Sequence, residues 1–250
     1  MDPNQLVFEI DTDYAHYQVW DTIYGGRPAR VLYSGERRTA QSGVARDDRP
    51  DLLFDYNQRM FELVSGLRPE RLLLIGGGAY TLPTALLAAL PDLRLDVVEI
   101  DSGLDKIATE YFGLRPNPRL RIVHGDGRRY LEQNSEPYDV ILVDAFVHAD
   151  TPSTLQSVGA VQEYKRNLTP HGLFARNVIS AYHGPVAAAL HQHVRDFEGV
   201  FKDVKVFPAG GSLPLYLAQN LVLTAQAGKS WPLDTYLRYP ALLREPFTNE

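Results

Sequence analysis

From Arg71 onward, short runs of almost wholly apolar residues alternate with longer stretches in which apolar residues recur at helical spacing. A run that is apolar on both faces suits a strand buried between two layers of helices. The pattern therefore predicts an α/β fold with a doubly wound parallel sheet. The predicted strands are 72–75, 95–100, 120–123, 140–143 and 172–179, and the predicted helices are 80–90, 103–112, 154–168 and 185–198.

The first 48 residues follow another pattern, because apolar and polar residues alternate along segments such as 7–10 and 16–20. Glycine-containing turns at 25–28, 34–35 and 42–43 separate these segments. Alternation interrupted by such turns predicts a small antiparallel β-meander.

The two patterns predict an N-terminal β-meander domain over residues 1–50 and a larger Rossmann-like α/β domain over 51–250. A helix over about 51–64, with apolar residues on one face, is expected to join them. The larger domain is expected to end with an antiparallel strand pair, 204–207 and 221–224, and a short surface helix from Ser230.

Composition excludes several classes of function. The chain contains no cysteine, which excludes disulfides, a cysteine nucleophile, zinc–thiolate sites and iron–sulfur clusters. Its net charge of −6 gives no support to binding nucleic acid or an anionic membrane. The acidic N-terminus lacks the basic start and apolar run of a signal peptide, and no apolar stretch is long enough for a membrane span. We expect a cytoplasmic protein without a metal site.

The first predicted strand of the sheet runs directly into Gly76-Gly77-Gly78 and then into a helix. Such a turn lets a ligand approach the backbone and presents the free N–H groups of a helix N-terminus. It can serve a dinucleotide, S-adenosylmethionine or only tight packing. Thr81 stands where the third glycine of a dinucleotide motif belongs, which argues against nicotinamide and flavin dinucleotides.

Acidic residues follow the next three strands, at Glu99, Asp126 and Asp144. The carboxyl ends of parallel strands meet at one edge of a sheet, so these acids and the glycine turn are expected to line one crevice. Glu99 has the spacing of an acid that accepts the hydroxyls of a ribose, and Asp126 could accept from an adenine amino group. Each acid alone could instead cap a helix or brace a loop.

Four motifs together resemble the spermidine synthase family of polyamine aminopropyltransferases. They are Ile75-Gly76-Gly77-Gly78, Val98-Glu99-Ile100-Asp101, Gly125-Asp126-Gly127 and Tyr138-Asp139-Val140-Ile141-Leu142-Val143-Asp144. The resemblance extends from about residue 14 to 224 and includes the meander. It implies a methyltransferase-like Rossmann core that binds decarboxylated S-adenosylmethionine, transfers its aminopropyl group to an amine and releases methylthioadenosine. It also implies a homodimer.

The resemblance assigns roles to individual residues. Asp144 matches the general base, and Tyr56 matches a tyrosine that orients the amine. The residues that match the nucleoside site are Gln18, Gly76, Gly77, Gly78, Glu99, Asp126 and Gly127.

The amine-binding half departs from the family pattern. The family usually has an aspartate where this chain has Ala79, and another where it has Val147. Its Tyr-His-Glu appears here as Tyr56-Asn57-Gln58. Asp150 could restore a lost carboxylate from a shifted position, although an exposed loop acid also explains it. We therefore expect a small-molecule amine substrate other than an ordinary long polyamine.

Two alternative functions stay open. An S-adenosylmethionine-dependent methyltransferase could use the same core, because an alanine at position 79 removes an acid that would repel the carboxylate of the intact cofactor. A nucleoside-binding protein without catalytic activity would also fit the loss of acids at positions 79 and 147.

Overall fold

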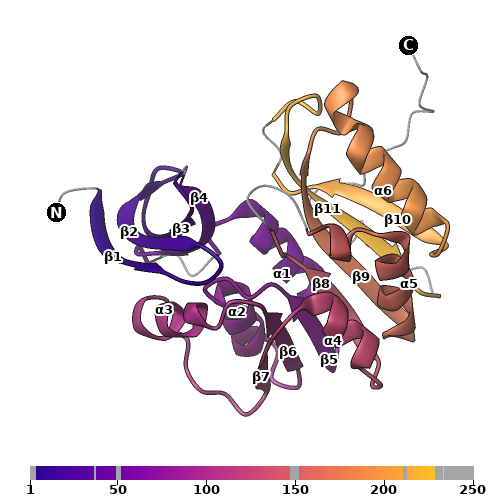
Figure 1. The fold of residues 1–250 in the computed structure, drawn as a ribbon, viewed down its shortest axis with the longest axis horizontal. Helices are drawn as coiled ribbons and strands as arrows, with labels where there is room; N and C mark the ends of the chain where they lie inside the picture. The colour runs from indigo at the N-terminus through magenta and orange to yellow at the C-terminus, as the bar shows by residue number, and fades with distance from the viewer. Residues whose placement is uncertain are drawn as a thin grey trace.

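A computed structural model describes residues 4–36, 38–48, 52–146, 152–210, 213–228 and Leu233. The chain forms a four-stranded sheet followed by a seven-stranded sheet with helices on both faces (Figure 1). The α/β fold class predicted from the sequence is confirmed.

The large sheet has the strand order β10-β11-β9-β8-β5-β6-β7. Its centre is parallel, and β11 joins β9 and β10 through antiparallel pairing. The predicted closing antiparallel pair is thus confirmed. The strands are β5 (Arg71–Ile75), β6 (Arg94–Glu99), β7 (Leu120–His124), β8 (Tyr138–Val143), β9 (Leu168–Ser180), β10 (Asp203–Pro208) and β11 (Gln219–Gln226).

Alternate residues of the central strands pack into two apolar cores, one on each face of the sheet. In β5, Leu72 and Leu74 face α1, α2 and α3, whereas Leu73 and Ile75 face α4, α5 and α6. This two-sided burial explains why the strands are continuous apolar runs. The helices are α1 (Asp55–Leu67), α2 (Thr81–Ala89), α3 (Gly103–Tyr111), α4 (Gly127–Gln133), α5 (Val158–Arg166) and α6 (Ala188–Glu198), with short 3-10 turns at Ser153–Leu155 (η1) and Pro185–Ala187 (η2).

Two elements differ from the sequence prediction. The helix expected over 154–168 begins only at Val158, after η1, and strand β9 already starts at Leu168. Helix α4 was not predicted, because Gly127 and Leu131 are its only buried residues and a polar seven-residue segment has no clear apolar period. The helix expected from Ser230 lies outside the described residues, apart from Leu233.

The N-terminal meander is confirmed as a four-stranded antiparallel sheet. It consists of β1 (Gln5–Asp11), β2 (His16–Tyr24), β3 (Arg27–Ser34) and β4 (Thr39–Ala45). Tyr17, Val19 and Leu32 belong to the same apolar core as α1 and α2, and Figure 1 shows the small sheet beside these helices. A domain boundary near residue 50 stays a prediction, since the two sheets share this core.

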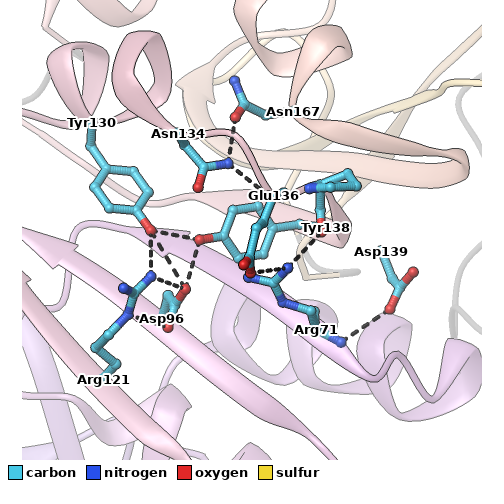
Figure 2. Close-up of polar contacts among 10 residues, drawn as sticks. Arg71, Asp96, Arg121, Tyr130, Asn134, Glu136, Tyr138, Asp139 and Asn167 are labelled. Atoms are coloured by element: carbon cyan, nitrogen blue, oxygen red, sulfur yellow. Dashed lines mark hydrogen bonds and ion pairs between the residues drawn. The ribbon is translucent and has the colours of Figure 1, made fainter.

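A polar cluster ties β6, β7 and β8 together near their amino ends (Figure 2). The Asp96 carboxylate accepts hydrogen bonds from the Tyr138 hydroxyl at 2.6 Å and from the Arg121 guanidinium at 2.6 and 2.9 Å. The Tyr130 hydroxyl of α4 lies 2.6 Å from that of Tyr138. We call Asp96, Arg121, Tyr130 and Tyr138 the strand-start cluster.

None of the helices in the described ranges has the length and apolar character that crossing a membrane requires.

Candidate functional site

A cavity of about 1200 Å³ lies between the N-terminal meander and the carboxyl edge of the large sheet. Its walls include residues of β2 and β4, the glycine turn after β5 and the start of α1. The residues that follow β6, β7 and β8 also line it, as the topology of an open α/β sheet predicts. Among the predicted site residues, those in its wall are Tyr56, Gly76, Gly77, Gly78, Glu99, Asp126, Gly127 and Asp144.

The glycine turn fits closely between β8 and the meander. Gly76 has φ of +94°, and a Cβ atom there would collide with the backbone carbonyl of Asp144. Gly78 has φ of +52°, and a Cβ atom there would lie 2.6 Å from Ser42 Oγ of β4. Both positions therefore need glycine for conformation and for space. The Ser42 hydroxyl also accepts a hydrogen bond from the Ala79 N–H at 3.0 Å, which fixes the turn against the meander.

Glu99 holds the same turn from the sheet side. Its Oε2 accepts from the backbone N–H groups of Gly77 at 2.6 Å and Gly78 at 3.3 Å, and its Oε1 accepts from that of Asp101 at 3.0 Å. Burial raises the pKa of Glu99, while these N–H donors act in the opposite direction. The N–H of Ile100 is a fourth donor that lowers this pKa, so the carboxylate is bonded mainly to the backbone and the ribose contact stays a prediction.

The meander reaches the glutamate through Asp101. Thr12 Oγ1 donates to Asp101 Oδ2 at 2.6 Å, and Asp101 Oδ1 accepts from the Gly103 N–H at 2.9 Å. The N–H of Asp101 donates to Glu99, as described above. A continuous chain of hydrogen bonds thus joins the loop after β1 to the glycine turn.

Asp126 is both a helix cap and a cavity residue. Its Oδ1 accepts from the Arg129 N–H at 2.9 Å, so it caps α4, which was one of the two readings of the sequence. It is also exposed in the cavity wall. Gly127 is buried beside it, and a Cβ atom there would collide with the side chain of Ile75. Capping leaves the second carboxylate oxygen available, so the adenine contact stays a prediction.

Asp144 lies directly after β8 and contacts two side chains. Asn177 Nδ2 of β9 donates to Asp144 Oδ1 at 3.1 Å, and the Tyr56 hydroxyl also hydrogen-bonds the carboxylate. Burial raises the pKa of Asp144 to about 6, against the lowering effect of these donors. The described helical segments that follow are capped by Pro152 and Ser157, so the alternative role of Asp144 as a helix cap is not found there.

Tyr56 comes from the first turn of α1. It is buried, and its hydroxyl lies 3.5 Å from the carbonyl of Gln41 as well as beside Asp144. Burial and the negative charge of Asp144 hold the pKa of Tyr56 well above its usual value. The phenol therefore stays protonated and acts as a donor to the carboxylate.

Asn177 is a cavity residue that the sequence prediction missed. It interrupts the apolar run predicted as strand 172–179, and it is 3% exposed. A polar side chain inside an otherwise apolar buried strand needs a partner, which is a signal that could have identified it.

Gln18 is not among the residues of the cavity wall, so the nucleoside contact that the resemblance implied stays a prediction without support from the cavity lining. Neighbouring side chains of a strand point to opposite faces, and Tyr17 of β2 points into the cavity and the core. Gln18 therefore points the other way. Its Nε2 donates to Glu9 Oε2 at 3.2 Å, and its Oε1 accepts from Trp20 Nε1 at 3.1 Å.

The positions that depart from the family pattern divide into two groups. Ala79 is 1% exposed, packs in the core shared with the meander, and is not part of the cavity wall. Val147 and Asp150 lie outside the described residues.

Within the described residues, no three His, Asp or Glu side chains gather as a metal site requires.

Comparison of the sequence with curated proteins finds two kinds of transferase. The polyamine aminopropyltransferase of Vibrio vulnificus is 35% identical over 151 residues, which cover 58% of this chain and 50% of that protein. The human eEF1A lysine and N-terminal methyltransferase is 28% identical over 197 residues, covering 68% of this chain and 28% of that protein. This chain thus spans about half the length of the aminopropyltransferase. No family model matches it.

Solved structures share the fold. A probable spermidine synthase from Corynebacterium glutamicum has a TM-score of 0.77 at 20% identity, covering 95% of this chain and 90% of that one. A spermidine synthase in complex with the transition state analogue AdoDATO has a TM-score of 0.68 at 17% identity, covering 90% and 73%. These comparisons confirm the predicted resemblance: the chain is similar in sequence to polyamine aminopropyltransferases and shares its fold with spermidine synthases.

Proposed function

We propose that this protein is a transferase that moves an aminopropyl group from decarboxylated S-adenosylmethionine to an amine and releases methylthioadenosine. The observation that carries the proposal is the position of Asp144. Its half-buried carboxylate, with a pKa of about 6, lies in the same cavity as the glycine turn and Glu99. The carboxylate that we propose as the base and the turn that we propose to hold the nucleoside therefore line one cavity.

The nucleoside is expected to bind along the carboxyl edge of β5, β6 and β7. In this arrangement Gly76, Gly77 and Gly78 let the donor approach the backbone closely, Glu99 accepts ribose hydroxyls, and Asp126 with Gly127 contacts the adenine. The donor brings its own reactive group, a positively charged sulfonium, so the chain needs only to bind it, orient it and supply a base.

Asp144 is the proposed base. An amine is protonated at neutral pH and must lose a proton before its nitrogen lone pair can react. Above pH 6 the Asp144 carboxylate is ionised and can take that proton. The lone pair then attacks the carbon next to sulfur, the carbon–sulfur bond breaks, and its electron pair stays on sulfur as a neutral thioether. Holding both reactants in one cavity favours this step by proximity.

A methyltransferase using intact S-adenosylmethionine is a second candidate. It is favoured by the human methyltransferase relative, which matches 68% of this chain. The same base could then serve a methyl acceptor.

Thermal unfolding in the presence of each ligand separates these candidates. A ligand at one hundred times its dissociation constant stabilises a protein by about 2.7 kcal/mol. We expect methylthioadenosine and decarboxylated S-adenosylmethionine to stabilise the chain more than intact S-adenosylmethionine. Stronger stabilisation by the intact cofactor would favour the methyltransferase, and no stabilisation by any of them would favour a protein without this activity.

The resemblance also leads us to expect a homodimer in the cytoplasm. Light scattering coupled to gel filtration gives the mass in solution, and a monomer at micromolar concentration would contradict the first part of this expectation.

A further inference from the structure

The loop between β1 and β2 is tied to Asp101 from both of its ends. Thr12 Oγ1 donates to Asp101 Oδ2 at 2.6 Å, as described above. At the other end of the loop, the Tyr17 phenol hydrogen-bonds the same carboxylate. Burial and the negative charges of Asp101 and Glu99 raise the pKa of Tyr17, so its phenol stays protonated and is the donor. The segment between these two anchors is therefore held close to the carboxyl end of β6.

The backbone of this segment is fixed, and it lies in the cavity wall. Residues 14–16 all line the cavity. Thr12 Oγ1 accepts from the backbone N–H groups of Tyr14 at 3.2 Å and of Ala15 at 3.1 Å. The methyl group of Thr12 packs on the start of α3, since a Cβ atom added to Gly103 would lie 2.7 Å from Thr12 Cγ2. The side chain of Tyr14 thus projects from a loop whose position is set.

Tyr14 is exposed although it lines a cavity. Among the described residues, the large apolar side chains that are both exposed and part of the cavity wall are Tyr14 at 56%, Ile100 at 44% and Ile179 at 42%. Ile100 follows Glu99 directly, and Tyr14 is anchored to Asp101. Two of these three side chains therefore flank the glutamate that we propose to bind the ribose. An aromatic ring exposed at this place suits a flat, apolar ligand surface such as a nucleobase.

We propose that Tyr14 stacks on the purine base of the donor nucleoside and covers it from the meander side. This inference rests on the proposed function and adds a specificity residue to the donor site. A base stacked on an aromatic side chain is shielded from water on one face, and every purine offers such a face. Tyr14 then supplies affinity for the base, while Asp126 would select among bases by hydrogen bonding.

The position of the loop favours the base over the sulfonium as the partner of Tyr14. The sulfur must lie near Asp144, because the proposed base acts on the amine that attacks the carbon next to sulfur. Asp144 follows β8, Asp101 follows β6, and β5 lies between these strands. With strands about 4.8 Å apart, the two strand ends are roughly 10 Å from each other. Tyr14 is anchored at the β6 end, on the side of the ribose and base.

Calorimetric titration with methylthioadenosine compares wild type with Tyr14→Leu and Tyr14→Phe. Truncation of an aromatic side chain that stacks on a base typically costs about 5- to 150-fold in affinity. We expect Tyr14→Leu to bind at least fivefold more weakly, and Tyr14→Phe to bind within twofold of wild type because it keeps the ring. Unchanged affinity in Tyr14→Leu would overturn the inference. Equal losses in both variants would also overturn it, because the hydroxyl and not the ring would then be responsible.

Tyr216→Leu is the matched control. Tyr216 is 65% exposed and is not part of the cavity wall, so this variant removes an equally exposed phenol elsewhere. We expect its affinity for methylthioadenosine to stay within twofold of wild type.

Fluorescence of Tyr14→Trp reports on the contact itself, which a purely structural role would not affect. A base that stacks on an indole ring quenches its emission. We expect saturating methylthioadenosine to quench Tyr14→Trp more than wild type, which has two tryptophans of its own, or Tyr216→Trp. The same quenching in all three proteins would contradict stacking at position 14.

A second nucleoside and a charged ligand sharpen the assignment. Stacking tolerates different purines, so Tyr14→Leu should weaken binding of methylthioinosine by about the same factor as methylthioadenosine. If the ring instead contacted the sulfonium, Tyr14→Leu would weaken binding of decarboxylated S-adenosylmethionine and leave the neutral methylthioadenosine unaffected. That result would overturn the inference.

The two proposals fail in different ways. If the wild-type chain does not bind methylthioadenosine, the proposed function is wrong and the inference fails with it. If wild type binds methylthioadenosine and Tyr14→Leu binds it equally well, only the inference about Tyr14 is wrong. The thermal unfolding midpoint of each variant shows that it is folded, which is expected for substitutions of an exposed side chain.

Discussion

Two polar clusters lie at opposite ends of strand β8, and they differ in whether their hydrogen bonds are complete. In the strand-start cluster, Asp96 is paired with Arg121 and Tyr138 (Figure 2). In the cavity cluster, formed by Tyr56, Asn57, Asp144 and Asn177, Asp144 is paired, but the Oδ1 atoms of Asn57 and Asn177 have no partner among the described residues. The comparison shows that the carboxylate that holds strands together has a charged partner, whereas the carboxylate in the cavity has only neutral partners.

The two carboxylates also differ in the direction of their pKa shifts. Burial raises the pKa of Asp144 to about 6, and its two neutral partners only partly offset this. Burial also tends to raise the pKa of Asp96, but hydrogen bonds from Arg121 and Tyr138 outweigh it and lower the pKa. The positively charged partner thus makes Asp96 a stable anion, while Asp144 stays near the pH at which it can exchange a proton.

The largest effect is expected for Asp144→Asn. Removing a general base typically costs about 10²–10⁴-fold in rate. The folded-state pKa of Asp144 is raised, so its contribution to stability declines as pH rises from the unfolded value through about 6. We therefore expect turnover to fall by about that factor at pH 7.5, with no loss of thermal stability and unchanged binding of methylthioadenosine. Retained turnover would remove Asp144 from the base role.

The Asp96→Asn substitution should lower the stability of the fold and leave ligand binding unchanged. It removes an anion paired with a guanidinium and a phenol, and hydrogen bonds to charged groups contribute about 1.5–3 kcal/mol each. We expect a loss of about 2 kcal/mol in the free energy of unfolding by urea denaturation, with methylthioadenosine affinity retained. The wild-type advantage should shrink as pH falls below the unfolded pKa of aspartate, because the folded-state pKa of Asp96 is lowered. Loss of methylthioadenosine binding with an unchanged free energy of unfolding would contradict this difference between the two clusters.

A smaller effect is expected for Tyr56→Phe. The Tyr56 hydroxyl lowers the pKa of Asp144, so its removal should raise that pKa. In wild type, turnover at saturating amine should increase about tenfold per pH unit below pH 6 and level off above it. In the variant this rise should move to higher pH, with little change at pH 8. A pH–rate profile measured in both proteins tests this, and an unmoved profile would mean that Tyr56 does not tune the base.

The smallest effect is expected for Gln18→Ala. Because this amide bonds Glu9 and Trp20 on the meander rather than lining the cavity, methylthioadenosine affinity should change by less than about twofold. Calorimetry can detect a larger change, which would restore the nucleoside role that the resemblance implied for this residue.

Much of the fold follows from the sequence because burial leaves a strong pattern. Strands β5, β6 and β8 pass through the core with both faces covered, so their residues have to be apolar and the runs are easily recognised. The acids at or just after the carboxyl ends of β6, β7 and β8 lie at one edge because parallel strands share a direction. That reasoning correctly brought Glu99, Asp126 and Asp144 to a single cavity.

Other parts of the site depend on contacts that no local pattern contains. The dipeptide Tyr17-Gln18 does not reveal which side chain points inward, since this depends on how β2 packs. Asn177 was hidden within a run treated as apolar. The contact of Ser42 with the glycine turn joins residues 37 positions apart along the chain and exists only when the meander is in place. Shape complementarity between distant segments decided each of these cases.

The chain of hydrogen bonds from Thr12 through Asp101 to Glu99 affects how the two sheets of the chain dock together. The cavity that we propose as the donor pocket is lined by both sheets, and the meander also contacts the glycine turn on its other side. Any ligand that fills the pocket must then also strengthen the docking of the two sheets. Saturation with methylthioadenosine should accordingly slow hydrogen exchange across residues 5–45, most of which lie outside the cavity wall. We therefore expect ligand binding and docking of the meander to strengthen each other.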